Sequence, residues 1–473
     1  MSTELTRSGV RRRRGRGLAS RLGAVIVVMA LVAAACGDSD DAETATVVPT
    51  TAAAATLAAV TAPEIPSSTV NMAIYPCCAD QSHYVIGLEK GWFADVGMEI
   101  DGGEFHLYTL FDQIVPSMQR GDFDVAGIFV QGYLQTLDTF GNDVPPIFFT
   151  DTYVGYSILK SPGSDAKTTE DFMAEGMSFR DAAAAAVSQL EGKEVYTPPH
   201  GQVQPPYPDV FMSYAGLSYP DDLDLQFLED VKIVEVAAQE GRIEFAIPYA
   251  APVLVQMIRE GWEPVINTVQ TLNDVGSAQA ERMTKLVGSS GLFAQRSWVD
   301  ADRDRALRLL SVTFRILEYL DSSATQHDGW VIQADLMNAS QGLSLIPEDV
   351  GVIWDSIDPM WKWEDQGPQL WDDPNAGNHV ETALQTQIGA LVENGTLEGP
   401  VDKYDIEAFL VAKSLFNELR DLQHEADALF AEANGADVEV GRGAVGVIAA
   451  AQTHYDNYNF VDAVRFLKAA LGK

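Results

Sequence analysis

Apolar and polar residues follow two different periods over the first two thirds of the chain. Short apolar runs with strand character, among them 69–75, 123–129 and 145–150, are separated by helical patterns of about ten residues. This alternation is typical of βαβ units, which build a mostly parallel sheet. It recurs loosely over 192–267, and 285–295 then reads as a strand that returns the chain to the first unit. The pattern therefore predicts two α/β units in tandem.

The last third of the chain, from Trp298 onward, has a helical pattern almost throughout. Its strongest amphipathic stretches are 299–320 and 404–433, in which apolar residues recur at a spacing near 3.6. A final pair of helices is expected at about 443–455 and 459–471. The pattern thus adds a helical C-terminal part to the two α/β units.

The composition is that of a soluble globular protein large enough for two or three folding units. The chain has 473 residues, of which 47% are hydrophobic and 21% charged. Its net charge is −37, and the first 35 residues hold seven Arg and one Glu, so the remainder carries −43. Such an acidic body repels phosphate backbones, and no nucleic-acid partner is expected.

The N-terminus has the features of a secretory signal. The basic run Arg11–Gly17 precedes the apolar run Leu22–Ala35, whose fourteen residues fall short of the roughly 20 that a membrane-spanning helix needs. The run ends at Cys36 and resembles a lipobox, in which this cysteine receives the lipid anchor. Ala33 departs from the Leu that is usual there, and secretion with cleavage after Ala35 is the alternative.

Two further cysteines are adjacent in the chain. Neighbouring Cα atoms lie about 3.8 Å apart, whereas an ordinary disulfide joins Cα atoms about 4.4–6.8 Å apart. A bridge between Cys77 and Cys78 would be strained, although an oxidising compartment permits it. The sequence leaves both the bridge and a pair of free thiols open.

Four stretches resemble the nitrate/sulfonate/taurine/thiamine-precursor group of ABC-transporter substrate-binding proteins. They are GLEKGWFADVGMEID (87–101), MQRGDFDVAG (118–127), RIEFAIPYAAPVLVQMIREGWEPVI (242–266) and LVGSSGLFAQRSWVDADRDRALRLL (286–310). Each motif is weak alone, but their order and spacing, together with the lipobox, form a strong combination. The similarity covers about 69–420.

The resemblance implies a type II periplasmic-binding fold, in which two α/β lobes are joined by two crossovers and a ligand sits in the cleft. The expected parts are a signal peptide (1–35), a lipid-anchor tether (36–67), lobe 1 (68–157), lobe 2 (158–270), the return to lobe 1 with its helices (271–420) and a helical extension (421–473). The expected protein is a monomeric, non-enzymatic subunit of an importer. It would be lipid-anchored on the extracytoplasmic face of the cell membrane, bind a small molecule and dock on an ABC permease, without a cofactor or metal.

In open α/β sheets, ligands bind beyond the carboxyl ends of the strands, which selects the loops that follow them. The candidate ligand-binding residues are Cys77, Cys78, Asp80, Gln81, His83, Phe129, Gln131, Asp151, Tyr153, His200, Gln202, Tyr207, Tyr249 and Ser289. These loops lack Arg and Lys, which favours a neutral or cationic organic ligand stacked on aromatic rings. An aminopyrimidine thiamine precursor is the sharpest hypothesis, although a helix N-terminus could bind a sulfonate, taurine or nitrate anion without Arg.

An enzyme is the rival class. Relatives of the family make a thiamine pyrimidine, but they use a cysteine-rich stretch that Cys77 and Cys78 do not reproduce. The seven His residues are scattered without metal-ligand spacing. GRGAVG (441–446) matches a dinucleotide-binding pattern, yet only 27 residues follow it, and they read as two helices. The sequence therefore favours a binding protein.

Overall fold

The computed structural model describes residues 60–108, 113–197, 207–227, 237, 240, 242–248, 250–435 and 443–473. The predicted signal peptide, Cys36 and most of the predicted tether lie outside these residues. Residues 57–473 form one compact unit. Within the described ranges, no helix combines the length and the apolar character needed to cross a bilayer.

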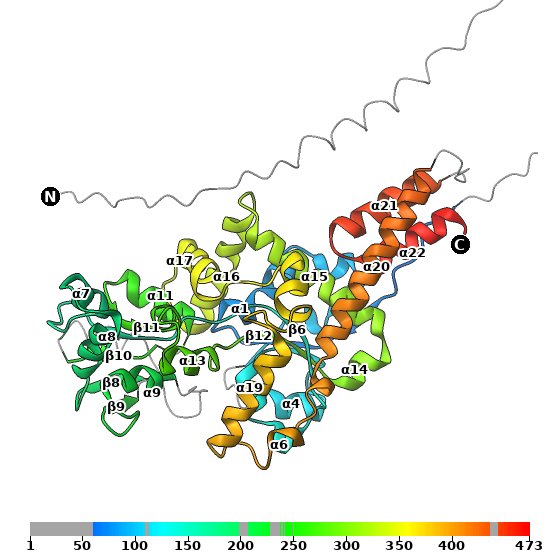
Figure 1. The fold of residues 1–473 in the computed structure, drawn as a ribbon. Helices are drawn as coiled ribbons and strands as arrows, with labels where there is room; N and C mark the ends of the chain where they lie inside the picture. The colour runs from blue at the N-terminus through cyan, green and yellow to red at the C-terminus, as the bar shows by residue number, and fades with distance from the viewer. Residues whose placement is uncertain are drawn as a thin grey trace, which may run out of the picture. The chain divides into compact units, whose positions relative to one another are not determined.

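Two five-stranded sheets divide the α/β part of the chain into two lobes (Figure 1). The sheet of lobe 1 has the order β4 (His106–Leu107), β2 (Met72–Ile74), β5 (Val125–Phe129), β12 (Ser290–Ala294) and β6 (Pro146–Phe149). The sheet of lobe 2 has the order β11 (Glu263–Asn267), β7 (Ser157–Lys160), β10 (Phe245–Ala246), β8 (Glu194–Thr197) and β9 (Asp224–Phe227). A small parallel pair joins β1 (Ser68–Val70) to β3 (Met98–Ile100).

The expectation of mostly parallel sheets is confirmed, since four of the five strands in each sheet run in the same direction and one is reversed. In lobe 1, β12 runs antiparallel to both β5 and β6, and in lobe 2, β7 runs antiparallel to both β10 and β11. Both strands follow a connection between the lobes. That connection delivers the chain to the sheet edge where the parallel strands end, so the incoming strand must run the opposite way.

Short helices flank both sheets. Lobe 1 has α1 (Ala79–Ser82), α2 (Tyr84–Glu89), α3 (Trp92–Asp95), α4 (Ile114–Arg120), α5 (Val130–Leu134) and α6 (Leu137–Phe140), and lobe 2 has α7 (Thr169–Ala174), α8 (Phe179–Ser188), α9 (Tyr207–Met212) and α11 (Ala251–Arg259). The helix expected to begin at Tyr84 and to be closed by Gly91 is confirmed as α2, and the short helix α3 follows it. Gly91 separates them with a φ of +74°, a left-handed conformation that glycine adopts without strain.

Two segments connect the lobes. The first crossover comprises residues 150–156, and the second comprises 268–289 with α12 (Thr268–Leu272) and α13 (Ala278–Thr284). The Tyr153 amide donates to the Gly288 carbonyl at 2.9 Å, which joins the two crossovers. On its other side, the first crossover pairs with residues 357–361, since the Val154 amide donates to the Ile357 carbonyl at 2.8 Å. A third segment therefore reinforces the hinge.

Helices from the last third of the chain pack around lobe 1 and the hinge. They are α14 (Arg296–Ala301), α15 (Arg303–Asp321), α16 (Gln326–Gln341), α17 (Pro347–Val352), the π-helix η4 (Ile353–Ile357), α18 (Trp363–Asp365), the π-helix η5 (Gln366–Trp371) and α19 (Val380–Glu393). The 3₁₀ helices η1 (Asp101–Gly103), η3 (Ser213–Ala215), η6 (Val401–Lys403) and η7 (Glu407–Phe409) complete these parts of the chain.

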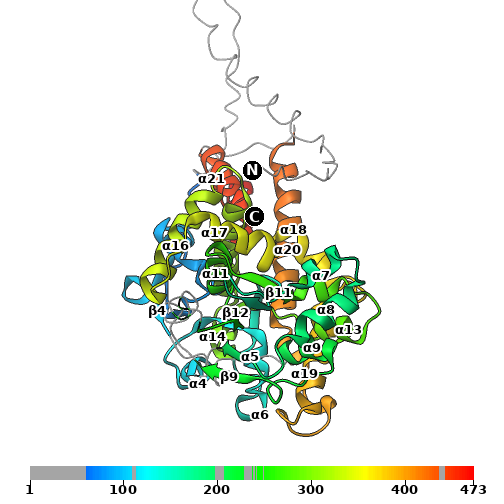
Figure 2. The ribbon, with the colours of Figure 1, turned by 90° about the vertical axis from the view of Figure 1, so that its left-hand side faces the viewer.

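Three further helices close the chain: α20 (Val411–Ala433), α21 (Ala444–Asp456) and α22 (Phe460–Leu471). In both views, α21 and the end of α20 lie at the same end of the molecule (Figures 1 and 2). They share an apolar cluster of their own that includes Ala426, Leu429 and Leu467. Because α20 runs without interruption through residues 420 and 421, the predicted boundary of the extension falls inside a helix.

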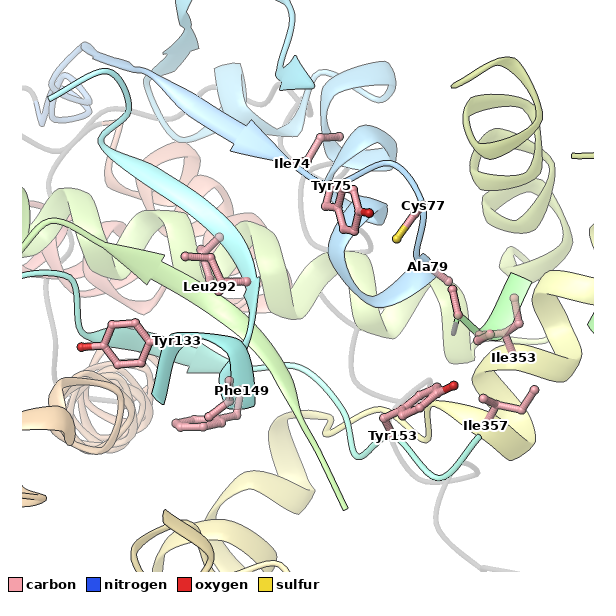
Figure 3. Packing of buried hydrophobic residues seen from close by; sticks show 14 of the residues in the cluster. Ile74, Tyr75, Cys77, Ala79, Tyr133, Phe149, Tyr153, Leu292, Ile353 and Ile357 are labelled. Atoms are coloured by element: carbon pink, nitrogen blue, oxygen red, sulfur yellow. The ribbon is translucent and has the colours of Figure 1, made fainter. Parts of the chain in front are cut away.

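One continuous hydrophobic core runs from lobe 1 through the seam between the lobes into lobe 2, where it includes Phe211 and Phe245. Ile74 and Leu292 are at most 1% exposed within the lobe 1 sheet, and Tyr153, Ile353 and Ile357 extend the same cluster toward the hinge (Figure 3). The two-lobe α/β fold and its C-terminal helices, predicted from the sequence, are confirmed.

Candidate ligand-binding site

One edge of the lobe 1 sheet faces the crossovers and carries the candidate site. Because β12 runs against its neighbours, Ser290 at its start pairs with Phe129 at the end of β5. Helix α1 lies directly against this edge, since a Cβ atom added at Gly127 of β5 would come within 3.1 Å of the Gln81 carbonyl oxygen. The absence of a side chain at Gly127 therefore lets α1 reach the strand ends.

A line of hydrogen bonds fixes the polar side chains at this edge. The Ser290 amide donates to Asp151 Oδ1 at 2.8 Å, and Gln81 Nε2 donates to Ser290 Oγ at 3.4 Å. The Tyr108 hydroxyl lies 2.5 Å from the Gly127 carbonyl oxygen and 3.3 Å from Gln81 Oε1. Asp151 Oδ2, by contrast, has no hydrogen-bond partner among the described residues.

Three carboxyl groups from distant parts of the sequence are buried at the seam, and we call them the acidic seam. Asp80 of α1 is 6% exposed, Asp151 of the first crossover 0%, and Asp358, just after η4, 1%. Burial raises the pKa of all three. The charge of Asp80 further raises the pKa of Asp151 and of Asp358. The acidic seam therefore resists full ionisation unless a counter-charge is present.

A row of tyrosines extends from the hinge into lobe 2. The rings of Tyr153 and Tyr156 meet edge to face, with centroids 4.6 Å apart. The ring of Tyr207, at the start of α9 in lobe 2, stacks on Tyr156 with centroids 3.9 Å apart and an interplanar angle of 19°. Phe129 meets Tyr153 edge to face at 6.4 Å. This tyrosine row thus joins both lobes across the seam.

Most of the described candidates from the sequence lie around the acidic seam and the tyrosine row. They are Cys77, Cys78, Asp80, Gln81, Phe129, Gln131, Asp151, Tyr153 and Tyr207. Gln131 of α5 donates to the Leu286 carbonyl in the second crossover, and the Tyr156 hydroxyl lies 3.5 Å from its Oε1. His200, Gln202 and Tyr249 lie outside the described residues.

The expectation that His83 faces the ligand meets a different environment. The side chain is fully buried, packs 4.0 Å from the ring of Tyr84 and lies 5.8 Å from that of Trp354. Burial lowers the pKa of His83 to about 3, so the ring is neutral at physiological pH. His83 therefore supplies no positive charge to the acidic seam, and both of its buried ring nitrogens lack a hydrogen-bond partner among the described residues, so its contact with a ligand stays a prediction.

Ser289 contacts the backbone of the acidic seam and also lines a cavity on the other side of the first crossover. Side chains alternate along the extended first crossover, so Thr152 and Val154 face away from Asp151 and Tyr153. Thr152, Val154 and Ser289 line a cavity of about 200 Å³ beside α19. The Ser289 hydroxyl donates to the Asp151 carbonyl at 2.7 Å, which fixes the backbone beneath the acidic seam. Through this hydrogen bond, Ser289 fixes the backbone position of Asp151.

The two adjacent cysteines form a disulfide at the start of α1. Cys77 and Cys78 are bonded to each other, with Cα atoms 3.8 Å apart. Cys77 is 3% exposed and belongs to the hydrophobic core, whereas Cys78 precedes Ala79 at the N-terminus of the helix. The bridge constrains the short turn that leads from β2 to Asp80 and Gln81.

Three residues of the site escaped the sequence analysis: Tyr108, Tyr156 and Asp358. Tyr156 lies three residues after Tyr153 in the same crossover, and this pair of tyrosines was a signal that the sequence offered. No signal in the sequence pointed to Asp358, because it follows a helical stretch far along the chain. Only the fold brings this stretch next to the first crossover. Tyr108 follows β4 and contacts Gln81. The sequence held no signal for it, because the position of β4 depends on the order of the strands in the sheet.

No protein-family model matches the chain, and no curated protein matches it. Solved structures of solute-binding proteins are similar to it. The periplasmic aliphatic sulphonate binding protein SsuA from Escherichia coli shares 13% identity with a TM-score of 0.49, over 72% of this chain and 91% of that one. The periplasmic nitrate-binding protein NrtA from Synechocystis PCC 6803 shares 16% with a TM-score of 0.49, over 76% and 89%.

An enzyme occurs among the similar structures as well. The desulfurization enzyme DSZB shares 12% identity with a TM-score of 0.44, over 74% of this chain and 99% of that one. Identities this low give no information on the ligand or on catalysis.

Proposed function

We propose that the protein is an extracytoplasmic solute-binding protein of an ABC importer, which captures a small organic molecule between its lobes and releases it unchanged. The observation that carries this proposal is the acidic seam at the junction of the two lobes. Its buried oxygen atoms Asp151 Oδ2 and Asp358 Oδ1 have no partner within the described part of the chain. Buried polar atoms are normally bonded, so a ligand is the natural partner.

The hinge supports capture by closure of the lobes. Two crossovers and the 357–361 segment connect the lobes, and rotation of lobes about such connecting segments is a common way to close on a ligand. Tyr207 approaches the site from lobe 2, whereas Asp80 approaches it from lobe 1. A ligand that contacts both lobes stabilises the closed arrangement, because only that arrangement provides both sets of contacts.

The sequence features of the N-terminus complete the proposal. Lipidation at Cys36 would hold the protein on the extracytoplasmic face of the membrane, and residues 36–67 would act as its tether. Replacing Cys36 with Ala should move the protein from the membrane fraction into the soluble fraction. Retention in the membrane fraction would contradict the lipid anchor while leaving ligand capture untouched.

A thiamine precursor is one specific candidate, since an aminopyrimidine combines a planar ring with amino groups. The tyrosine row offers aromatic faces, and the acidic seam offers hydrogen-bond acceptors. The anion alternative has less support, because no Lys or Arg forms an ion pair with the acidic seam among the described residues.

Thermal unfolding of the purified protein against a metabolite panel tests this function. A ligand at 100 times its Kd should add about 2.7 kcal/mol to the free energy of unfolding and raise the melting temperature. The compound should be recovered chemically unchanged after incubation. Turnover would make the protein an enzyme, and a flat response to amines, pyrimidines, sulfonates and oxyanions would contradict solute binding.

A further inference from the structure

The acidic seam brings three carboxyl groups together, and none of them lies on an exposed surface. Asp80, Asp151 and Asp358 come from three separate elements, and each is at most 6% exposed. No ion pair within the described ranges includes any of them. Burying a carboxylate without a counter-charge is costly, and proteins usually pair such groups. Such groups stay neutral by retaining their protons, or ionise beside a cation that comes from outside the chain.

A second observation points to a ligand independently of the carboxyl groups. The hydroxyl of Tyr153 is buried in a side chain that is 8% exposed, and it has no hydrogen-bond partner among the described residues. Figure 3 shows this hydroxyl directed toward the side on which Ala79 and Ile353 lie. Burial raises the pKa of Tyr153, and the charges of Asp358 and Asp80 are among the causes that raise it further, which places this hydroxyl near two members of the acidic seam.

A metal ion is a poor match for this arrangement. Within the described part of the chain, no group of three or more His, Cys, Asp or Glu side chains is placed to hold a metal ion. A metal needs its oxygen ligands to converge at about 2.0–2.6 Å. The carboxyl groups are instead distributed beside aromatic rings, which suits a larger molecule that carries its positive charge on an organic skeleton.

The tyrosine row supplies the second element of such recognition. Tyr153, Tyr156 and Tyr207 lie with successive centroid distances of 4.6 and 3.9 Å. The faces of aromatic rings attract ammonium and related cations, and this attraction strengthens when water is excluded. Carboxylates and ring faces together select an organic cation over a neutral or anionic molecule of the same shape.

We propose, on the basis of the solute-binding function above, that the ligand is an organic cation whose charge lies between Asp80, Asp151 and Asp358 and whose skeleton packs on the tyrosine row. Ammonium, amidinium and protonated amino-heterocycle groups fulfil this description. Tyr153 contributes a hydroxyl to the same ligand from the first crossover. The acidic seam thus sets the sign of the charge, and the tyrosine row sets the preference for a packed skeleton.

A matched series of compounds tests the inference. Propyl, cyclohexylmethyl and benzyl skeletons are each prepared with an ammonium, a hydroxyl or a sulfonate head group, and each is titrated into the purified protein at neutral pH by calorimetry and thermal unfolding. Ammonium compounds should bind at least ten times more tightly than their hydroxyl and sulfonate counterparts. Sulfonates or alcohols that bind equally well would overturn the cation inference but leave solute binding intact.

Variants separate the acidic seam from general electrostatic attraction. Asp358→Asn keeps the size of the side chain and should weaken binding of the best ammonium compound by at least ten-fold. Asp402→Asn removes the same charge from an exposed position in η6 and should leave binding unchanged. Equal effects of the two substitutions would overturn a specific role for Asp358. Failure of every compound to bind would count against the solute-binding function itself.

Discussion

At the scale of single residues, the site depends on carboxyl groups whose pKa values are raised above the ordinary Asp value. Burial raises the pKa of Asp358, and the charges of Asp80 and Asp151 raise it further. The hydroxyls of Tyr153 and Tyr156 also lie near this carboxyl, and burial raises the pKa of both. His83 is neutral above about pH 3 and gives no compensation.

This arrangement predicts that the ligand-free protein loses stability as pH rises. Above the ordinary Asp pKa of about 3.9, the unfolded chain has released protons that the folded acidic seam retains. Folding therefore takes up protons, and the free energy of unfolding falls as pH increases toward the raised pKa values. Asp358→Asn should flatten this slope by up to about 1.4 kcal/mol per pH unit, the contribution of one proton.

Urea denaturation of the wild type, Asp358→Asn and Asp402→Asn at several pH values from about 4 to 8 measures this slope. Asp402→Asn should follow the wild type. A wild-type slope in Asp358→Asn would show that this carboxyl is ionised normally in the folded protein.

A second residue-scale prediction concerns the disulfide between Cys77 and Cys78. The purified protein, denatured without reductant, should yield no alkylated Cys77 or Cys78 in a mass spectrum, and both should be alkylated after reduction. Ligand binding should weaken on reduction, because the turn before Asp80 and Gln81 loses its covalent constraint. Alkylation without reduction would contradict the bridge.

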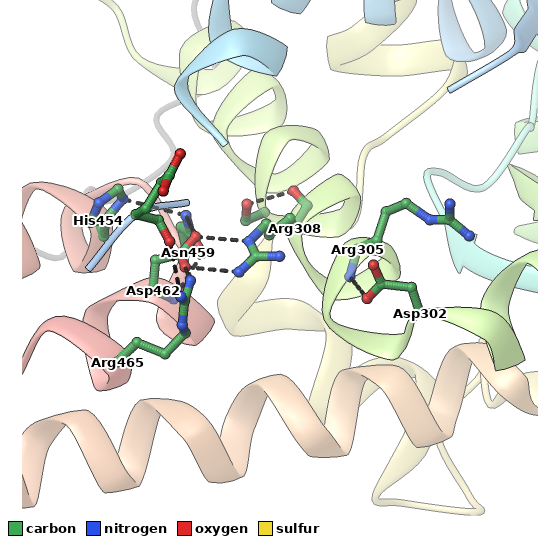
Figure 4. A network of polar contacts seen from close by, with 9 residues as sticks. Asp302, Arg305, Arg308, His454, Asn459, Asp462 and Arg465 are labelled. Atoms are coloured by element: carbon green, nitrogen blue, oxygen red, sulfur yellow. Dashed lines mark hydrogen bonds and ion pairs between the residues drawn. The ribbon is translucent and has the colours of Figure 1, made fainter. Parts of the chain in front are cut away.

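At the scale of elements, α22 attaches the C-terminal helices to lobe 1 through a buried ion pair. Arg308 of α15 donates to both carboxylate oxygens of Asp462 at 2.8 and 2.9 Å, and Asn459 and Arg465 complete the network (Figure 4). Burial alone would raise the pKa of Asp462, but the hydrogen bonds from Arg308 and Asn459 hold it below its usual value.

Asp462→Asn should lower the free energy of unfolding by about 3–5 kcal/mol, since it leaves the Arg308 guanidinium buried without its counter-charge. Replacing both residues with Met should recover most of this loss. Glu425→Gln is the matched control, because Glu425 pairs with Lys468 at an exposed position and should change stability by less than about 1 kcal/mol. Urea denaturation provides the comparison, and a small effect of Asp462→Asn would contradict the proposed attachment.

Elements also explain how far the sequence could predict this structure. The two periods of the hydrophobic pattern identified strands such as 123–129 and the helices of the last third. An element with one buried face shows apolar residues at its own period, which can be read from neighbouring positions in the sequence. Sheet order is not encoded locally, which is why the one reversed strand in each sheet was not predicted. Asp358 was missed for the same reason, because its neighbours Ile357 and Pro359 accept hydrogen bonds from the first crossover across some 200 residues of sequence.

At the scale of the whole molecule, a contact between lobe 2 and the C-terminal part of the chain favours the arrangement described here. Arg259 of α11 pairs with Asp349 of α17, and its Nη2 donates to the Ser344 carbonyl at 2.6 Å. Helix α17 packs on α16, which in turn contacts α1 and α2 of lobe 1. This ion pair therefore links the two lobes independently of the crossovers.

Arg259→Ala should shift the lobes toward an open arrangement and weaken ligand binding about five-fold, a change of about 1 kcal/mol. Small-angle scattering should show a larger radius of gyration for the ligand-free variant than for the wild type. Arg120→Ala, which removes an exposed ion pair within lobe 1, should change neither value. Identical scattering from Arg259→Ala and the wild type would contradict a link between the lobes.

The central claim is that two hinged lobes clamp a small molecule at their seam. The most direct measurement is the distance distribution between spin labels attached to cysteines that replace the exposed residues Glu104 of lobe 1 and Glu191 of lobe 2. It should be recorded without ligand and with the compound of the matched series that raises the melting temperature most. The account predicts a shorter and narrower distribution with the compound. An unchanged distribution at saturating compound would contradict it.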